Sequence, residues 1–342
     1  MAKLATLGLC TVGVLCAAWS GGWYYGEKKI RSGVEAEIAR MAEQGVAARY
    51  QSLEIGGFPF AYQGKVVEPR TQAMSLIGGV QARTDWGAPW ISFETSVSDF
   101  GTINFALPET QTVRLTPVQG GPMADITIRS TEFKGSLQRQ SAGARITGDG
   151  RDVEITATSQ ALINPLELKA DSVSLDSSAP LEEPGAITAA ASLSGLTANE
   201  GVWGFFDPGK RFPRDPANLK LVANADTALR ADRTLTLQSF NIEEIVANVA
   251  GVEVKGDGQA VVKNQRPDGK MVLRFSGLNG FFDSAIEAGM LPEQQATIYQ
   301  GMLNRFAKKG ETEGEQVFTI GFKGGLIFVN GFPTFVPAPL LP

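Results

Sequence analysis

The residue types that most often carry catalysis are scarce in this chain of 342 residues. It has no histidine, which excludes Ser-His-Asp and Cys-His nucleophile systems, the common zinc sites and the usual proton shuttle near pH 7. Both cysteines, Cys10 and Cys16, lie in an apolar N-terminal stretch, so the rest of the chain forms no disulfide and has no thiol chemistry.

Paired carboxylates are the next candidates for chemistry. Glu182-Glu183 and Glu243-Glu244 are adjacent in sequence. Neighbouring residues of a strand point to opposite faces, so neither pair is expected to converge on one substrate, and both are interpreted as solvated surface.

Two further patterns have ordinary structural interpretations. Asp207, Arg214 and Asp215 lie among prolines, where an Arg–Asp ion pair would hold a loop; the alternative is a site for a cation or a headgroup. The glycines of Gly256-Asp257-Gly258 lack the strand-loop-helix context and the Lys-Ser/Thr of a phosphate-binding loop, and indicate a hairpin turn. We therefore expect a non-enzymatic protein with no catalytic residue, metal or cofactor. The alternative is a hydrolase that uses a Ser-Lys pair or two buried carboxylates.

Aromatic residues form the remaining group of candidates, because they gather near glycine and proline. They are Phe58, Phe60, Trp86, Trp90, Trp203, Phe205, Phe206, Phe281 and Phe282. Packing between sheet and helices explains any one of them. The alternative is that some line an apolar groove for acyl chains or contact a bilayer interface.

The N-terminal segment predicts how the chain is placed in the cell. Residues 4–25 are nearly uncharged and end in aromatics, which is typical of a membrane-spanning helix with an interfacial aromatic belt. We expect a transmembrane signal-anchor over residues 1–27; a cleaved signal peptide and a buried soluble helix are the alternatives. The basic residues Lys28, Lys29 and Arg31 favour a cytoplasmic body by the positive-inside rule, whereas a strand-rich body without cysteine favours export. The local charges leave the orientation open.

The segment after the predicted anchor has the period of a helix. Ile30, Val34, Ile38 and Met41 recur at spacings of three and four, which predicts a helix over 28–49. That helix would extend from the membrane as a stalk or pack its apolar stripe on a sheet.

From residue 50 onward, short alternations of apolar and polar residues predict antiparallel strands. Met271, Leu273 and Phe275, for example, alternate with Val272 and Arg274. We expect a β-rich body over 50–342 in one extended, curved antiparallel sheet, with packed helices near 198–206, 281–288 and 292–308.

Glycine- and proline-rich pieces mark the expected turns and boundaries of this body. The expected turns are Gly120–Pro122, Asp149-Gly150, Asp257-Gly258 and Pro267–Gly269. Gly57-Phe58-Pro59 has a near copy in Gly331-Phe332-Pro333, and we expect the two copies to lie at the start and the end of one continuous fold.

Composition limits the partners. The chain is 43% apolar and 20% charged with a net charge of −5, so it can bury a core and is not a disordered chain. No basic tract interleaves with aromatic residues, so we expect no nucleic-acid partner.

The order of several short motifs resembles a known family. The motifs are Trp19–Trp23, Gly57–Pro59, Trp86-x-x-Pro-Trp90, Trp203 with Asp207-Pro208, Pro213–Pro216, Gly289-x-Leu-Pro292, Gly324-Gly325 and Pro337–Pro339. In this order they resemble the bacterial domain-of-unknown-function family 2125 over nearly the whole chain. The resemblance implies a single-pass protein of the Gram-negative inner membrane with its body in the periplasm, and it supplies no catalytic residues.

A looser resemblance, at the level of the fold, is to AsmA-like envelope proteins. It implies a curved sheet that binds or shelters lipid or another apolar ligand. The alternative function is a scaffold that binds another envelope protein.

Overall fold

The computed structural model describes residues 26–339, except 44, 58–60, 78–79, 97–98, 141–142, 181–184, 207–209, 211–213, 230–234, 250 and 288–290. The helices in this part of the chain are α2 (Gly26–Glu43), α3 (Glu200–Phe206), α4 (Leu278–Glu287) and α5 (Glu293–Phe306). The strands up to residue 140 are β1 (Val46–Arg49), β2 (Ser52–Gly56), β3 (Ala61–Val67), β4 (Arg70–Ile77), β5 (Val80–Gly87), β6 (Trp90–Ser96), β7 (Asp99–Leu107), β8 (Thr110–Pro117), β9 (Ala124–Arg129) and β10 (Glu132–Gln140). The later strands are β11 (Gly143–Ser159), β12 (Leu166–Ala179), β13 (Ala186–Ala198), β14 (Ala217–Leu229), β15 (Leu235–Val249), β16 (Val252–Lys263), β17 (Arg266–Ser276), β18 (Lys308–Lys309), β19 (Gln316–Lys323), β20 (Leu326–Val329) and β21 (Phe332–Pro337).

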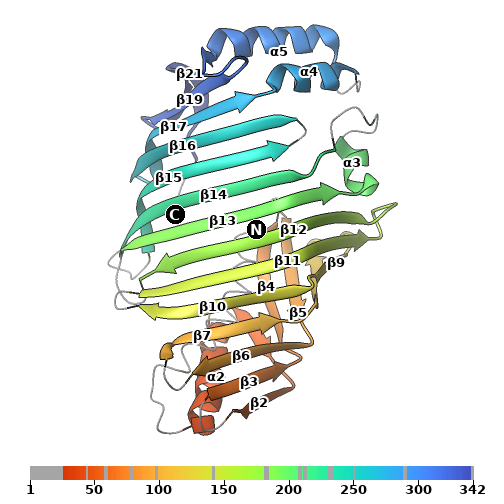
Figure 1. The fold of residues 1–342 in the computed structure, drawn as a ribbon, viewed down its shortest axis with the longest axis vertical. Coiled ribbons are helices and arrows are strands. Elements are labelled where there is room, and N and C mark those ends of the chain that lie inside the picture. The colour runs from red at the N-terminus through yellow and green to blue at the C-terminus, as the bar shows by residue number, and fades with distance from the viewer. Residues whose placement is uncertain are drawn as a thin grey trace. The chain divides into compact units, whose positions relative to one another are not determined.

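These elements confirm the prediction of a mainly β, antiparallel fold with a few helices (Figure 1). The chain divides into two compact units. Unit 1 contains the described residues of Met1–Arg139 and Thr147–Lys169, and unit 2 contains those of Gln140–Ile146 and Ala170–Pro342. The prediction of a single body over 50–342 stays a prediction, and each unit is described by itself.

Unit 1 is an antiparallel meander whose strands form two layers. The chain passes from one layer to the other at sharp bends, which we call corners. Layer 1 pairs its strands in the order β1, β4, β5, β8, β9. Layer 2 pairs them in the order β2, β3, β6, β7, β10. The chain passes from β3 to β4 at Glu68-Pro69 and returns from β5 to β6 at Ala88-Pro89.

Proline accounts for two of these corners, because its ring fixes the φ angle and it has no N–H to donate to the hydrogen bonds between strands. The two corners also bond to each other: Glu68 N donates to Pro89 O at 2.9 Å, and Ala88 N donates to Pro69 O at 3.2 Å. The Trp86-x-x-Pro-Trp90 motif is therefore the corner that joins layer 1 to layer 2.

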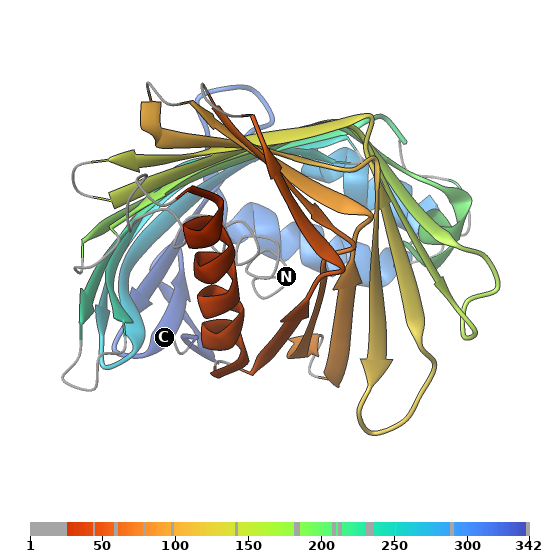
Figure 2. The ribbon, with the colours of Figure 1, turned by 90° about the horizontal axis from the view of Figure 1, so that it is seen from below.

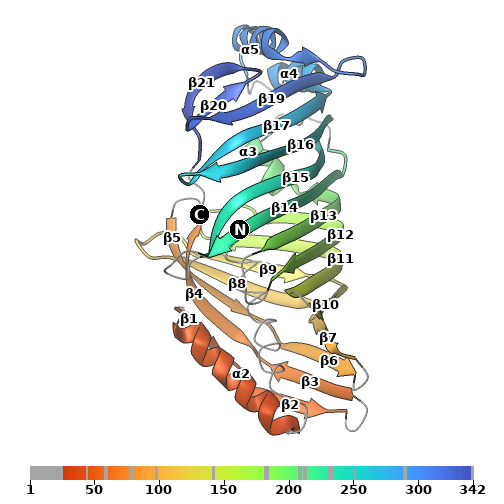
Figure 3. The same cartoon turned by 90° about the vertical axis from the view of Figure 1, so that its left-hand side faces the viewer.

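Both layers and α2 share the core of unit 1. Val34 and Met41 of α2 are 2% and 1% exposed and pack with Leu53, Trp86 and Ile91. Figure 3 shows α2 lying across β1, β3 and β4. The apolar stripe of this helix thus packs on the sheet.

The predicted helix over 28–49 is wrong at its C-terminal end. The helix ends at Glu43, and Val46–Arg49 forms β1, which pairs with β4. Gly45 has a φ of +79°, and its N–H donates to Ala42 O, as in a helix that is terminated by glycine. Valine at 46 favours a strand, and the ladder with β4 satisfies the backbone of this segment.

Unit 2 is also a meander of sequential strands. β13, β14, β15, β16, β17, β19, β20 and β21 pair in that order, all antiparallel. Figures 1 and 2 show these strands in green to blue, with α4 and α5 near β17 and β19. Ala285 of α4 and Ala296 of α5 are buried, at 5% and 0% exposed.

The three helices of unit 2 lie close to the predicted ranges with shifted ends. α3 begins at Glu200 because Asn199 caps it: Asn199 Oδ1 accepts from Val202 N at 3.1 Å. Pro292 precedes the first residue of α5. Lys308 and Lys309, predicted as the end of that helix, form β18 against β19.

The two Gly-Phe-Pro copies share a backbone role. Gly57, between β2 and β3, has a φ of +88°, and Gly331, between β20 and β21, has a φ of +89°. Each glycine therefore supplies the left-handed conformation that a tight connection needs. Gly57 belongs to unit 1 and Gly331 to unit 2.

The predicted span over 1–27 lies, up to residue 25, outside the described residues. Within the described part of the chain, no helix combines the length and the apolar character that crossing a bilayer requires.

Candidate functional site

One face of the sheet in unit 2 is apolar across six strands. Directly opposite residues of neighbouring antiparallel strands point to the same side, so the strand registers define this face. One row runs Ala191, Leu221, Ile245, Gly256, Leu273 and Phe318 from β13 to β19. The apolar face consists of Ile187, Ala189, Ala191 and Leu193; Leu219, Leu221, Ala223 and Ala225; Phe240, Ile242, Ile245 and Ala247; Val254, Gly256, Gly258 and Ala260; Gly269, Met271, Leu273 and Phe275; and Phe318, Ile320 and Phe322.

This apolar face is only partly buried. Among its described side chains, Ala260 and Phe318 are buried, whereas Leu219 and Leu221 are 37% and 43% exposed. The cluster of buried hydrophobic residues lies in unit 1. With strands about 4.8 Å apart and residues rising about 3.3 Å each, the face extends about 24 Å across the strands and about 20 Å along them.

The opposite face of the same strands is polar, and we call it the polar face. Lys220 Nζ lies 2.6 Å from Glu244 Oε2, Asn224 donates to Glu243 at 2.6 Å, and Arg274 donates to Asp257 at 2.8 Å. The hydrogen bond to Asp257 raises the pKa of the Arg274 guanidinium. The sheet of unit 2 is thus amphipathic, with its charges paired on one side and its hydrocarbon on the other.

Glycine and alanine lower the middle of the apolar face along β16. Gly256 lies between Ile245 and Leu273, and Gly258 lies between Ile242 and Met271. Ala260 lies between Phe240 and Gly269. A Cβ at Gly256 would lie 2.6 Å from Leu273 Cδ2, so the neighbouring leucine leans over this glycine. Nearby, the rings of Phe275 and Phe318 meet edge to face, with centroids 5.6 Å apart.

The chemistry available on this face is burial of hydrocarbon. The side chains that define this face carry no hydrogen-bonding group, and Gln316, directly opposite Phe275, is a polar residue at its edge. In the part of the chain that the structure describes, no group of three or more carboxylate, cysteine or histidine side chains could hold a metal ion. The face can therefore bind an apolar ligand by area and shape.

The predicted aromatic residues lie elsewhere. Trp86 is 7% exposed in the core of unit 1, where its indole N–H donates to Gln111 Oε1 at 3.3 Å. Trp90 is half-buried, with Lys65 Nζ 5.7 Å from its ring centroid. Phe58 and Phe60 lie outside the described residues.

The other predicted aromatics lie on the helices of unit 2. Trp203 of α3 has the Arg214 guanidinium 5.3 Å from its ring centroid. Phe281 and Phe282 of α4 meet edge to face with centroids 6.1 Å apart. Phe205 and Phe206 belong to α3 by backbone, but their side chains are not described. None of the described aromatics from the predicted set belongs to the apolar face, and their role at a groove or interface stays a prediction.

The structure describes some of the other candidates for chemistry. Arg214 pairs with Glu200 rather than with Asp215, and Asp207 and Glu182-Glu183 lie outside the described residues. Gly256–Gly258 is no turn, because it lies inside β16 opposite β17.

The comparisons with known proteins give one match. The sequence profile of a family described as an uncharacterized protein conserved in bacteria (DUF2125) matches residues 23–337. Neither the curated proteins nor the solved structures compared with the chain give a match.

Proposed function

We propose that this chain, which belongs to the uncharacterized bacterial family DUF2125, is a non-enzymatic envelope protein that binds lipid acyl chains on the apolar face of unit 2. The observation that carries the proposal is the continuity of that face. Six strands in register present hydrocarbon on one side, and apart from the buried Phe318 its large side chains are left partly exposed.

The composition of the face favours acyl chains over a protein partner. Protein interfaces carry about one hydrogen bond per 100–200 Å² and a polar rim. Across β13 to β17, the apolar face offers no side-chain donor or acceptor. An acyl chain needs none, and each CH₂ that it buries contributes about 0.8 kcal/mol.

The predicted anchor supports the same ligand. An uncharged run over residues 4–25 would hold the body beside a bilayer, which is a continuous supply of acyl chains. We therefore propose a single-pass protein of the bacterial inner membrane with its body in the periplasm. The curved, AsmA-like groove expected from the looser resemblance is part of this proposal.

Two matched substitutions test it. Leu221→Asp places a charge on the apolar face, and Val261→Asp places the same charge on the polar face at a position of similar exposure, 45% against 43%. The full chain and both variants are purified, and the co-purifying lipid is extracted and quantified by mass spectrometry. We expect L221D to lose most of the lipid and V261D to retain it.

Two outcomes of this experiment contradict the proposal. One is a folded wild-type protein that carries no lipid above the level of a detergent blank. The other is an equal loss of lipid in both variants, because then the position of the charge would not matter.

A second candidate function, a scaffold for another envelope protein, is favoured by β21. Phe332, Phe335 and Val336 on this strand are 58%, 82% and 50% exposed. In-cell crosslinking from these positions distinguishes the two functions. A reproducible protein partner together with lipid-free protein would favour the scaffold.

A further inference from the structure

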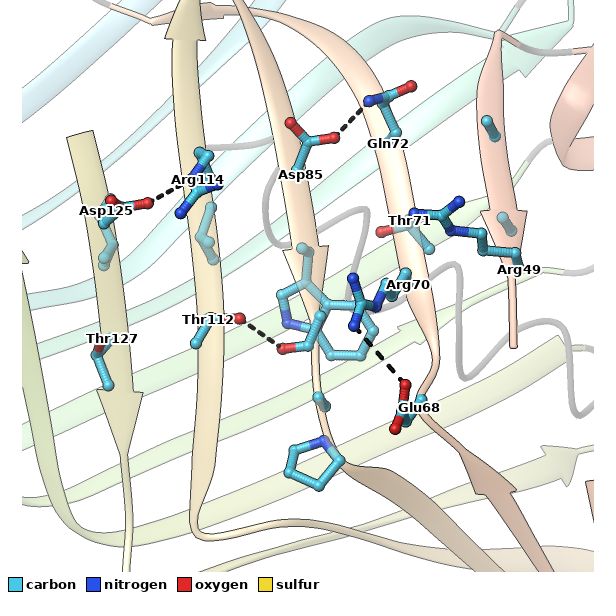
Figure 4. A pocket seen from close by; sticks show the side chains of 18 of the residues that line it. Arg49, Glu68, Arg70, Thr71, Gln72, Asp85, Thr112, Arg114, Asp125 and Thr127 are labelled. Atoms are coloured by element: carbon cyan, nitrogen blue, oxygen red, sulfur yellow. Dashed lines mark hydrogen bonds and ion pairs between the residues drawn. The ribbon is translucent and has the colours of Figure 1, made fainter. Parts of the chain in front are cut away.

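Unit 1 contains a polar groove of about 960 Å³ along layer 1. It is lined by residues of β1, β4, β5, β8 and β9, and Figure 4 shows its side chains. The charged and hydroxyl side chains of the lining alternate along their strands with core residues such as Trp86 and Val113, so they point away from the core. The strand registers arrange these side chains in two rows that run across the strands.

The first row is a ladder of paired groups. Gln72, Asp85, Arg114 and Asp125 lie directly opposite one another in turn. Gln72 Nε2 donates to Asp85 Oδ1 at 2.5 Å, and Arg114 Nε donates to Asp125 Oδ1 at 2.6 Å. That hydrogen bond to Asp125 raises the pKa of Arg114. The two acidic groups of this row are therefore already engaged by donors of the groove.

The second row has cations at one end without matching anions. Arg49 of β1 lies directly opposite Arg70 of β4, and like charges opposite each other destabilise a sheet. Arg70 has only Glu68, 3.7 Å away, with both side chains more than half exposed, and such a pair contributes little. Among the described residues, no carboxylate pairs with Arg49.

Beyond the two arginines, the next position of this row is a glycine, and the two positions after it are threonines. Gly87 lies opposite Arg70, then Thr112 and Thr127 follow on β8 and β9. A Cβ at Gly87 would lie 3.7 Å from both Arg70 Cγ and Thr112 Oγ1, so the missing side chain leaves room between arginine and threonine. Thr112 donates to Gly87 O over a long 3.4 Å, and Thr127 makes no side-chain hydrogen bond within the described part of the chain.

We propose that the polar groove binds a phosphate group between the guanidinium groups of Arg49 and Arg70 and the hydroxyl of Thr112, which lies two strands from Arg70 across the gap at Gly87. A planar guanidinium group can donate two parallel hydrogen bonds to phosphate oxygens. A phosphate bound between two guanidinium groups would also offset the repulsion between their charges. The cavity of about 960 Å³ is much larger than a phosphate, so it has room for the rest of a molecule that carries the phosphate.

This site is independent of the apolar face, since all its residues lie in unit 1. The phosphate could belong to a lipid headgroup or to a soluble phosphorylated compound. The experiment therefore uses three probes: inorganic phosphate, glycerol 3-phosphate, and a short-chain phosphatidylglycerol below its micelle concentration. Short-chain diacylglycerol, which lacks the phosphate, is the matched control ligand.

The full chain is titrated with each probe by isothermal titration calorimetry. Two variants are compared with the wild type: Arg49→Gln with Arg70→Gln in the groove, and Arg145→Gln with Arg274→Gln in unit 2, which removes the same charge. We expect the groove variant to weaken phosphate binding by about tenfold or more, because charge-assisted hydrogen bonds are lost. The control variant should bind like the wild type.

A second variant covers the case in which the double arginine variant does not fold. Thr112→Val keeps the charge and the shape and removes only the hydroxyl, so it should weaken binding by a smaller factor. Equal binding by the threonine variant and the wild type would contradict the site.

The probes also identify the source of the phosphate. Binding of the two small phosphates supports a soluble compound, and binding of phosphatidylglycerol alone supports a headgroup. The proposal is overturned if no phosphate probe binds the wild type, or if diacylglycerol binds L221D as tightly as phosphatidylglycerol does, because this variant should no longer hold acyl chains on the apolar face. L221D, which tests the apolar face, should leave the binding of inorganic phosphate unchanged, so the two proposals can fail separately.

Discussion

Glycine and phenylalanine share one row of unit 1. Gly64, Phe93, Phe105 and Gly135 lie directly opposite one another on β3, β6, β7 and β10. A Cβ at Gly64 would lie 1.9 Å from Phe93 Cζ, and one at Gly135 would lie 2.2 Å from Phe105 Cζ. Each ring therefore covers the glycine beside it, and the two outer positions need to lack a side chain.

Gly64→Ala should destabilise the protein by about 1–3 kcal/mol, because Phe93, 6% exposed in the core, has to move. Urea unfolding followed by circular dichroism measures the change. Gly56→Ala is the control, since a Cβ there meets nothing within 4 Å and should change stability little. Equal losses in the two variants would contradict this account of the row.

Asp176 gives unit 2 a pH-dependent contribution to stability. Arg145 Nε donates to Asp176 Oδ1 at 2.8 Å, and this hydrogen bond lowers the pKa of Asp176. A carboxylate whose pKa is lower in the folded state stabilises the fold above its unfolded pKa, about 3.9 for Asp, and loses this contribution as the pH falls through the lower value.

Asp176→Asn should therefore lower stability at neutral pH, with a difference from the wild type that shrinks as the pH falls below about 3.9. Urea titrations at a series of pH values test this. A difference that stays constant from pH 7 down to pH 3 would show that the ion pair is not its cause.

A bulge places Glu243 and Glu244 differently from the sequence-based prediction. Regular alternation would send them to opposite faces, but the pairing of β14 with β15 shifts register between Val222 and Ala223. Both carboxylates consequently pair with polar-face residues, Glu243 with Asn224 and Glu244 with Lys220. The extra residue of this bulge is Glu243 on β15, which has no partner on β14. The local sequence does not show the bulge, because it depends on how the two strands pair.

At the scale of the element, α2 joins the two layers of unit 1. Its inward residues Val34, Glu37 and Met41 are 2%, 4% and 1% exposed, and Arg40 Nε donates to Glu37 at 2.7 Å. The helix buries a charged carboxylate only with its partner one turn away, in agreement with the cost of an unpaired buried charge.

Met41→Ala should cost about 2–5 kcal/mol of stability, as for large-to-small changes in a core. Glu35→Ala, on the exposed side of the same helix, should stay within about 0.5 kcal/mol of the wild type. Thermal or urea unfolding distinguishes the two. A stalk helix free of the sheet would instead give similar, small effects at both positions.

The strands were predictable and the turns were predictable only in part. The alternation around Met271, Leu273 and Phe275 predicts β17, and Gly120-Gly121, with φ of +83° and +131°, lies in the predicted connection between β8 and β9. Asp149-Gly150, Asp257-Gly258 and Pro267–Gly269, predicted as turns, lie inside strands. Glycine is suited to these positions because the neighbouring strands come close. A Cβ added at Gly258, for example, would lie 2.6 Å from Met271 Cα.

The turn between β16 and β17 is made by Asn264 and Gln265 instead, with φ of +52° and +61°. Such a pair has the backbone of a two-residue hairpin, but glutamine gives little sign of it in sequence. The candidate site was missed for a related reason. Alternation marks an apolar side on each strand, but only the register shows that six such sides form one face.

At the scale of the whole molecule, the proposed membrane anchor requires the body to lie on one side of the bilayer. The charges at Lys28, Lys29 and Arg31 favour the cytoplasm, and the family resemblance implies the periplasm. We expect the periplasm. A phosphatase that is active only after export, fused behind Pro342, should be active in cells, and a cytoplasmic reporter at the same position should be silent.

Membrane attachment is tested separately from topology. The full chain should stay in the pellet after alkaline extraction of membranes, and deletion of residues 1–27 should release it. Release of the full chain would contradict the anchor, while an inactive phosphatase fusion on a protein that stays in the pellet would reverse only its orientation.

The pairing of unit 2 has a consequence for how such proteins can vary in length. Each strand from β13 to β17 pairs with the next one in sequence. A hairpin can therefore be duplicated or lost without changing the order in which the remaining strands pair. One added hairpin would widen the apolar face by about 9–10 Å and leave its chemistry unchanged. If the apolar face binds acyl chains as proposed, the number of strands would set the size of the ligand. The strands here have 11 to 15 residues, so one added hairpin would correspond to an insertion of about 25–30 residues with its turns.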